Sequence, residues 1–159
     1  MCAKLVLTIC AATMILGCAK EAEEAKPAEE KAAAPASTSY PGEAVSVEPT
    51  AMASGLKYVD YVKGNGTTAE SGKAVVVHYT GYLTNGFKFD SSLDRDQAIQ
   101  FQLGAGEMIK GWDEGIVGMQ IGGKRKLIIP PAMGYGASDY GPIPGGSVLV
   151  FDIELLEVK

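Results

Sequence analysis

The sequence has few of the residues on which most metal and nucleophilic sites depend. Its 159 residues include three Cys, one His and one Trp. A single His excludes a multi-histidine metal site, and the three Cys have no metal-ligand spacing and are too few for a disulfide scaffold. With 14 Lys+Arg against 19 Asp+Glu, the formal net charge is −5. There is no basic surplus to neutralise the phosphates of a nucleic acid, so we expect no nucleic-acid partner.

The length fits one domain with appendages, and the chain starts with an export signal. Within residues 1–17, Lys4 precedes an apolar run of about 12 residues from Leu5 to Leu16, which is the layout of a secretory signal peptide. The run is too short to span a bilayer, which needs roughly 20 apolar residues. The following Ile15-Leu-Gly-Cys18 resembles a bacterial lipobox, in which the Cys is lipidated.

We therefore expect a lipid anchor, palmitate included, on Cys18. The alternative is an ordinary signal peptide that is cut elsewhere, in which case Cys18 has no role. Several acyl chains on one Cys would hold the protein on a membrane, whereas a single chain binds only marginally. Because Ala19 stands where an inner-membrane retention Asp would follow the Cys, the expected location is the bacterial cell envelope, on the outer membrane facing the periplasm.

Residues 18–50 contain the Cys and then almost only Ala, Glu, Lys, Pro, Ser and Thr. Pro27 and Pro35 interrupt the one helix-friendly stretch, and no apolar stripe develops. Low hydrophobicity with excess charge cannot offset the entropy cost of ordering, so we expect a disordered tether. It is either a spacer that holds a domain off the membrane or a degraded leader without a role, and the anchor before it favours the spacer.

Residues 51–159 hold 18 of the 20 Gly, all four Phe and the only Trp, so this segment is the folded domain. Period-two alternation predicts strands, which are expected over residues 56–62, 74–83, 87–90, 98–103, 124–129 and 147–158. The one convincing helix covers about 108–117, where Ile109, Trp112 and Ile116 share a face and Gly118 follows as a stop. The predicted class is α+β, a curved antiparallel half-barrel of five to six strands wrapped over one short helix.

The chemistry of this domain is not evident from single residues. His78 falls on the strand face opposite Tyr79, and a lone strand His is usually structural. Lys124-Arg-Lys126 is most simply interpreted as a solvated strand end. A set of aromatic side chains is placed where strands and helix could converge, and it predicts either a core or an apolar pocket: Tyr79, Phe89, Trp112, Tyr135 and Phe151.

Four ordered motifs decide between these alternatives. Val76-Val-His-Tyr-Thr-Gly-Tyr-Leu83 is followed by Gly86-Phe-Lys-Phe-Asp-Ser-Ser92, by Gly106-Glu-Met-Ile-Lys-Gly-Trp-Asp-Glu-Gly115 and by Leu149-Val-Phe-Asp-Ile-Glu-Leu155. Together with the intervening Met119–Lys126 and Ile129–Ala137, they resemble the FKBP-type peptidyl-prolyl cis-trans isomerases, the macrolide-binding immunophilins. The resemblance covers roughly residues 52–159 in family order. It implies a half-barrel over one helix, which agrees with the strands and the helix expected above.

The resemblance implies an apolar pocket that receives the substrate proline. Trp112 matches the residue whose indole forms the pocket floor. The walls match Tyr79, Phe89, Met108, Ile109 and Phe151. Asp90 matches the carboxylate at the pocket edge, Arg95 the basic residue that pairs with it, and Tyr135 the phenol that hydrogen-bonds a ligand carbonyl. The backbone N–H of Ile109 matches a second donor.

Two further positions are expected to form the rim of the pocket, and a third departs from the family pattern. Ile99 stands where many members carry a second aromatic, which predicts a shallower wall. Tyr140 and Ile143 are expected to form the rim of the loop between residues 134 and 147, where the alignment with the family is least certain.

The implied activity is acceleration of X–Pro isomerisation in exported proteins as they fold. Rotation about the amide faces a barrier of ~20 kcal/mol, and a dry aromatic cavity favours the twisted, less polar amide over the planar one. Such a reaction needs no metal or cofactor. The implied partners are proline-containing polypeptides and macrolide inhibitors, and we expect a monomer. The alternatives are a non-catalytic module that holds proline segments and a structural lipoprotein that merely inherited the fold.

Overall fold

The computed structural model describes residues 40–43 and 47–159. The predicted signal peptide over residues 1–17, the predicted lipidation of Cys18 and most of the predicted tether lie outside the described residues. Within the described part of the chain, no helix is long and apolar enough to cross a membrane. The same residues hold no group of three or more His, Cys, Asp or Glu side chains arranged to bind a metal ion.

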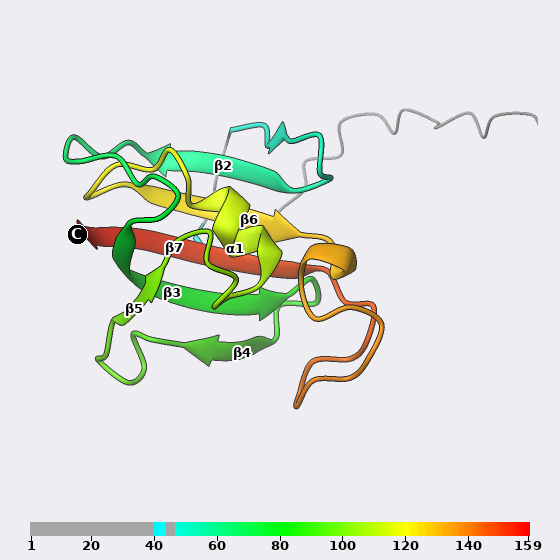
Figure 1. Cartoon of the computed structure of the whole chain (residues 1–159). Coiled ribbons are helices and arrows are strands. Elements are labelled where there is room, and N and C mark those ends of the chain that lie inside the picture. Colours follow the sequence, from blue (N-terminus) through cyan, green and yellow to red (C-terminus); the bar gives the residue numbers. More distant parts are fainter. Residues whose placement is uncertain (1–39, 44–46) are drawn as a thin grey trace, which may run out of the picture. The chain divides into compact units, whose positions relative to one another are not determined.

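In the described residues, seven strands form a single antiparallel sheet with the spatial order β1-β2-β6-β7-β3-β4. β5 pairs with the first half of β3 and β4 with its second half, so both lie along the same edge of β3 (Figure 1). The strand bounds are β1 Thr50–Ala51, β2 Lys57–Val62, β3 Ala74–Leu83, β4 Lys88–Ser91, β5 Ile99–Gln102, β6 Lys124–Ile129 and β7 Leu149–Val158.

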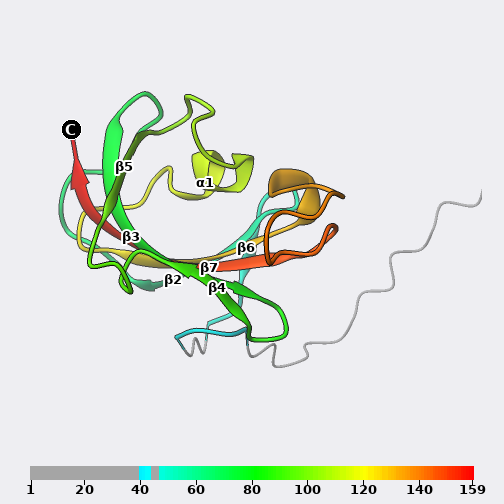
Figure 2. The same ribbon diagram turned by 90° about the horizontal axis from the view of Figure 1, so that it is seen from below.

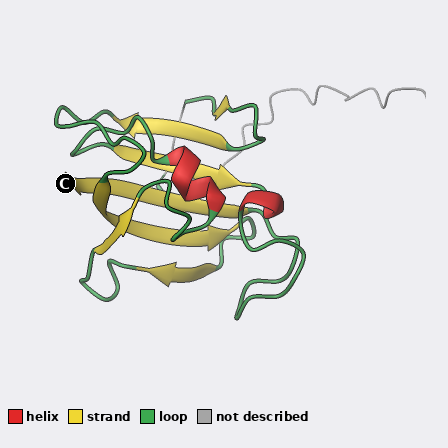
Figure 3. Ribbon diagram, viewed as in Figure 1, coloured by secondary structure: helices red, strands yellow, loops and turns green. Residues whose placement is uncertain are grey.

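These bounds confirm the predicted α+β class and place every predicted strand within two residues of its observed limits. The one strand that the alternation did not predict is β1, whose two residues pair with Lys57 and Tyr58 of β2. It is too short to show a period, and it is recognisable only from its partner. Helix and strand content are mapped in Figure 3.

The sheet is curved, and α1 (Lys110–Gly115) lies against its inner face, as Figure 2 shows. We call this the concave face and the opposite one the convex face. Alternation assigns the side chains: Val75, Val77 and Tyr79 of β3 are all buried in the core, as the sequence predicts. On β7 the residues Leu149, Phe151, Ile153 and Leu155 share that core. The concave face is therefore almost wholly apolar.

The helix is shorter than the periodicity indicates, and side-chain hydrogen bonds to the backbone hold the chain before its start and at its end. At the start, the Asp113 carboxylate accepts hydrogen bonds from the backbone of Gly104 at 2.9 Å and Gly106 at 3.1 Å, closing the loop that leads into α1. At the end, Arg125 Nη1 donates to the carbonyl oxygens of Gly115 at 2.6 Å and Val117 at 3.2 Å. A cation at the carbonyl end of a helix is favourable, because the last carbonyls lack partners within the helix.

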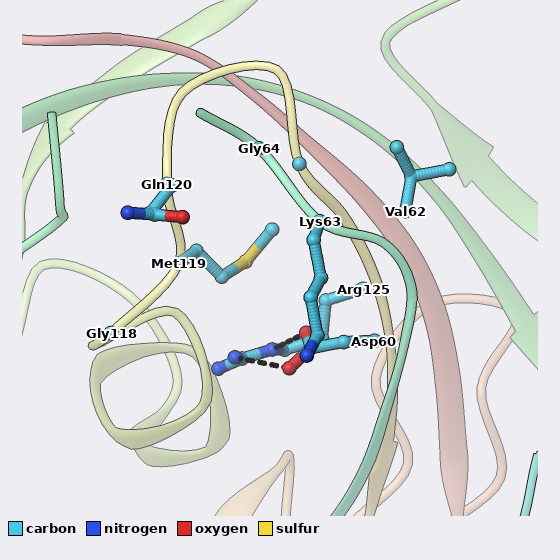
Figure 4. Close-up of a pocket in the computed structure, with 9 residues that line it drawn as sticks. Asp60, Val62, Lys63, Gly64, Gly118, Met119, Gln120 and Arg125 are labelled. Carbon is cyan, nitrogen blue, oxygen red and sulfur yellow. Dashed lines mark hydrogen bonds and ion pairs between the residues drawn. The ribbon is translucent and has the colours of Figure 1, made fainter. Parts of the chain in front are cut away.

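Arg125 also connects α1 to the edge of the sheet. Its guanidinium binds Asp60 of β2 through two hydrogen bonds of 2.5 and 2.9 Å, which Figure 4 shows as dashed lines beside a hollow between β2 and the turn after α1. The guanidinium carbon lies 4.4 Å from the centre of the Tyr58 ring. The interpretation of residues 124–126 as a solvated strand end is therefore wrong, since Arg125 is 7% exposed and Lys126 is fully buried.

Lys126 points to the convex face, which carries this charge beside buried apolar side chains such as Val59 and Val150. Its ammonium lies 2.7 Å from Asp152 Oδ1 on the neighbouring strand β7. Pro41 and Glu43, which lie in the predicted disordered tether of residues 18–50, bind this same ion pair. The sequence gives no sign of the contact, since the two partners are more than 80 positions apart.

Candidate active site

An apolar hollow opens on the concave face, between α1, the ends of β3, β4 and β7, and the loop after the 3-10 helix η1 (Pro131–Met133). Its volume is about 350 Å³, which is the size of an ordinary small-ligand site. The lining residues are Tyr79, Phe89, Asp90, Glu107, Met108, Ile109, Trp112, Tyr135, Tyr140 and Phe151.

Trp112 lies at the bottom of this hollow and is packed edge-on by two other rings. Its ring centre is 5.0 Å from that of Tyr79 at an interplanar angle of 72°, and 5.3 Å from that of Phe151 at 88°. Edge-to-face contacts of this kind fix ring orientation as well as burying area. The indole N–H has no hydrogen-bond partner among the described residues, so the floor holds one buried donor that is left unpaired.

Phe89 and Phe151 form a wall whose position depends on a missing side chain. Their ring centres are 5.5 Å apart at 87°. Gly81 of β3 lies beneath both: a Cβ there would be 2.6 Å from Phe89 Cζ and 2.8 Å from Phe151 Cε1. The backbone of β3 can therefore support the two rings only because position 81 has no side chain.

One polar cluster lies at the edge of the hollow. The Tyr79 hydroxyl donates to Asp90 Oδ2, Arg95 Nη1 donates to Asp90 Oδ1, and Arg95 Nη2 donates to the Tyr79 hydroxyl at 2.9 Å. The backbone N–H of Ser91 adds a further bond of 2.9 Å to Asp90. Asp90 is thus an ionised carboxylate with all its charge locally matched.

The titration behaviour of the cluster follows from these contacts. Partial burial acts to raise the pKa of Asp90, but the hydrogen bonds from Arg95 and Tyr79 outweigh it and the pKa lies below its ordinary value. Burial, followed by the hydrogen bond to Asp90, raises the pKa of the Tyr79 phenol. Asp90 therefore stays charged and Tyr79 stays protonated at neutral pH, and neither group is set to transfer a proton.

Two residues that line the hollow carry donors without a partner among the described residues. Burial first, then the neighbouring Tyr140 and Asp90, raises the pKa of Tyr135, so its hydroxyl keeps its proton. That hydroxyl makes no hydrogen bond to any other described residue, and its ring stacks on Tyr140 with centres 4.3 Å apart and planes 5° apart. Ile109 precedes the first turn of α1, where a backbone N–H has no partner within a helix.

The structure brings most of the predicted pocket residues together and separates three. Arg95 lies behind Asp90 rather than in the lining, and acts on the hollow through Asp90 and Tyr79. Ile99 packs on the core from β5 and does not line the hollow. Ile143 is 4% exposed and belongs to the core, so the expectation that it forms the rim with Tyr140 differs from the structure. The backbone pairing of Tyr140 with Ile143 makes a tight turn that directs Ile143 inward.

Sequence reasoning missed two features of the site. Glu107 lines the hollow, and its carboxylate accepts a hydrogen bond of 2.9 Å from the backbone of Gln102. It lies directly before two predicted wall residues, which is the signal that could have found it. Gly81 contributes by having no side chain, and only the register of β3 against β4 and β7 shows what that absence makes room for.

Comparison with known proteins decides the family. The sequence profile described as FKBP-type peptidyl-prolyl cis-trans isomerase matches residues 65–156. The chain belongs to this isomerase family. An FK506-binding protein of Neisseria meningitidis serogroup B is 56% identical over 105 residues, covering 65% of this chain and 96% of that protein. FK506-binding protein 2 of Dictyostelium discoideum is 54% identical over 91 residues, 57% of this chain and 68% of that protein.

Solved structures of FKBP-type proteins share the fold. The crystal structure of AtFKBP13 matches with a TM-score of 0.67 and 42% identity, over 71% of this chain and all of that one. The crystal structure of FkpA from Escherichia coli matches with a TM-score of 0.65 and 40% identity, over 70% of this chain and 51% of that chain. The half-barrel over one helix is thus the FKBP fold, and the chain is a peptidyl-prolyl cis-trans isomerase.

Proposed function

We propose that the hollow over Trp112 is the site at which this isomerase rotates X–Pro bonds, and that it does so without a covalent step. The observation that carries the proposal is the aromatic floor, with Trp112 held edge-on by Tyr79 and Phe151 at ring distances of 5.0 and 5.3 Å. A proline ring seated there would place its preceding amide between the floor and the polar edge formed by Asp90 and Tyr135.

The physical reason is differential binding. In the planar ground state the amide is resonance-stabilised and strongly polar, whereas the twisted transition state has lost that resonance across a barrier of ~20 kcal/mol. An apolar cavity solvates the planar, more polar amide poorly. Transfer from water into the cavity therefore costs less free energy for the twisted amide than for the planar one. Binding the twisted form more tightly is sufficient for catalysis.

We assign the polar groups to orientation. The Tyr135 hydroxyl and the Ile109 backbone N–H can donate to substrate carbonyl oxygens on either side of the proline. Asp90, fixed by Arg95 and Tyr79, contributes a constant negative charge at the edge. Because the pKa of Asp90 is lowered and those of Tyr79 and Tyr135 are raised, these groups keep one protonation state throughout turnover.

The deciding experiment measures cis/trans relaxation of short X–Pro peptides with the full chain and with Tyr135→Phe. We expect acceleration by the wild type and a several-fold lower kcat/KM for Tyr135→Phe, since one hydrogen bond contributes about 1 kcal/mol. Wild-type rates equal to the uncatalysed ones would contradict the enzyme assignment. Tight peptide binding in the same sample would then favour the non-catalytic proline-binding module.

We further propose that residues 1–17 are a lipoprotein signal peptide, that Cys18 carries the lipid and that the isomerase acts on exported polypeptides at the outer membrane. The supports are the apolar run, the Ile15-Leu-Gly-Cys18 sequence and the Ala19 that follows. Cys18→Ser should move the protein from the membrane fraction to the soluble fraction of the envelope. Unchanged fractionation would contradict lipidation at this position.

A further inference from the structure

A short segment of the chain lies on the convex face, directly over a buried ion pair. The segment is Tyr40–Glu43, which we call the strap. The Pro41 carbonyl accepts a 2.7 Å hydrogen bond from the Lys126 ammonium, and the Glu43 backbone N–H donates a 3.0 Å hydrogen bond to Asp152 Oδ2. In Figure 2 the strap lies on the side of the sheet away from α1.

The strap meets part of the requirement that a buried charge pair imposes, because Asp152 Oδ1 faces the Lys126 ammonium but makes no hydrogen bond among the described residues. Lys126 is fully buried and the Asp152 side chain is 13% exposed, with 2.7 Å between their charged atoms. Removing two charges from water costs more than their attraction returns unless further hydrogen bonds satisfy them. Pro41 and Glu43 supply one such bond to each partner. The buried pair and the strap therefore depend on each other.

A second ion pair on the same two strands, which the strap does not contact, offers a comparison. Lys124 and Glu154 lie opposite each other on the same face of the β6–β7 ladder, two residues away from Lys126 and Asp152 on each strand. Their side chains are 34% and 36% exposed and their charged atoms are 3.4 Å apart. The two pairs lie on the same face of the same two strands, but Lys124 is the first residue of β6 and Lys126 lies within it. Hydrogen bonds from the strap reach only the more buried of the two pairs.

Gly42 makes the fit specific to this segment. Its φ is +94°, and a Cβ at this position would be 2.0 Å from Asp152 Oδ2 and 2.9 Å from Lys126 Nζ. Only glycine can bring the backbone this close to the pair. The Tyr61 phenol lies beside the strap. Its pKa is raised, first by burial and then by the Asp152 charge and a hydrogen bond to Glu43, so the phenol stays protonated.

We propose that the convex surface formed by Lys126, Asp152 and Tyr61 is a docking site for the chain's own Pro41-Gly42-Glu43 sequence. The site recognises a backbone carbonyl, a residue without a side chain and a backbone N–H in succession. Its role is to fix the point at which the N-terminal segment joins the isomerase, on the face opposite the pocket. The spacer of the proposed anchor then ends at residue 39 rather than at residue 50.

The test compares two glycines with matched backbones in the full chain. Gly42 and Gly72 have φ values of +94° and +89°, but a Cβ at Gly72 meets nothing within 4 Å. Gly42→Ala and Gly72→Ala thus carry the same backbone strain, and only the first meets the ion pair. The readout is the rate of cleavage after Glu43 by a Glu-specific protease, normalised to cleavage after Glu30 in the same sample.

We expect wild type and Gly72→Ala to be protected at Glu43 and Gly42→Ala to be cleaved at least tenfold faster there. In a Lys126→Met/Asp152→Leu background, which lacks both charges that bind the strap, Gly42→Ala should add less than a further twofold. Equal cleavage of Gly42→Ala and Gly72→Ala would overturn the proposal, as would cleavage of wild type after Glu43 as fast as after Glu30. Isomerase activity, measured on the same variants, should be unchanged, so the proteolysis result stands whatever the outcome for the proposed function.

Discussion

The two faces of the sheet use alternate residues of the same strands, but one face packs an apolar core and the other holds a buried ion pair. On β7, Phe151 and Ile153 face the apolar core, while Asp152 between them lies in an ion pair on the other side. On β6, Leu127 is in the core and Lys126 before it is paired with Asp152. Because side chains alternate along a strand, one ten-residue strand contributes to both the proposed pocket and the proposed strap site.

We expect residues of the concave face to govern turnover and residues of the convex face to govern stability. The concave face holds the aromatic rings of the proposed pocket, and substitutions there should change turnover. The convex face holds charges that must be satisfied internally, and substitutions there should change the free energy of unfolding and leave turnover unchanged. Each variant below tests whether the faces are independent in this way.

Asp152→Ala should have the largest effect. It leaves the fully buried Lys126 ammonium without its carboxylate, and breaking a buried pair from one side costs about 3–5 kcal/mol. Urea unfolding measures the loss. The double variant Lys126→Met/Asp152→Leu removes both charges and should recover most of it. A double variant as unstable as Asp152→Ala would show that packing rather than charge dominates the convex face.

Gly81→Ala should come next and should act on the other face. A methyl group there would lie 2.6 Å from Phe89 and 2.8 Å from Phe151, so both rings must move, at a cost of about 1–3 kcal/mol. We expect the loss in kcat/KM to exceed tenfold, because the displaced rings form the pocket wall. The control is Gly86→Ala, where a Cβ meets nothing within 4 Å and the φ of +89° adds only backbone strain, at a residue outside the lining of the hollow. Unaltered turnover in Gly81→Ala would contradict the placement of this wall.

Asp90→Asn tests the polar edge of the pocket and should lower kcat/KM about tenfold, or ~1.4 kcal/mol. The sign of its pH dependence follows from the lowered pKa of Asp90. The charged form contributes stability that is present above the ordinary Asp pKa of about 3.9 and is lost as the pH falls through the lower folded value. Wild-type activity should therefore be flat from about pH 5 to 8.

The control for this prediction is the variant itself in acid. Asp90→Asn has no carboxylate to protonate, so its stability should fall less than that of wild type below about pH 4. A wild-type activity profile that drops between pH 5 and 7 would show that Asp90 titrates during catalysis, contrary to a fixed orienting role.

Lys124→Met should have the smallest effect. The Lys124–Glu154 pair is about one-third exposed on both sides, and exposed pairs contribute about 0–1 kcal/mol. Its unfolding midpoint in urea should almost match that of wild type, in contrast to Asp152→Ala on the same ladder. A loss of stability as large as that of Asp152→Ala would mean that the strap is not what distinguishes the two pairs.

The concave face was predictable from sequence, and the convex face was not. Alternation places Tyr79 and Phe151 on core faces because apolar residues recur with the period of the strand, and family motifs supply Trp112, Asp90 and Tyr135. No such periodicity reports Lys126, since a buried lysine has the same appearance in sequence as a solvated one. Its burial depends on Pro41, which is 85 positions away. Periodicity did not place Ile143 correctly either, because a tight turn rather than a repeating pattern sets the direction of its side chain.

The position of β7 in the sheet sets an order of events for the protein's own folding. Leu149–Val158 is the last strand in the chain and lies between β6 and β3 at the centre of the sheet. Until it is available, the β2–β6 pair and the β3–β4–β5 group are two separate open-edged fragments, and the pocket lacks Phe151. A chain that emerges N-terminus first can therefore neither close its sheet nor isomerise a client bond before its final strand has been delivered. Non-local pairing of this kind folds slowly, so the isomerase itself passes through an interval of exposed strand edges.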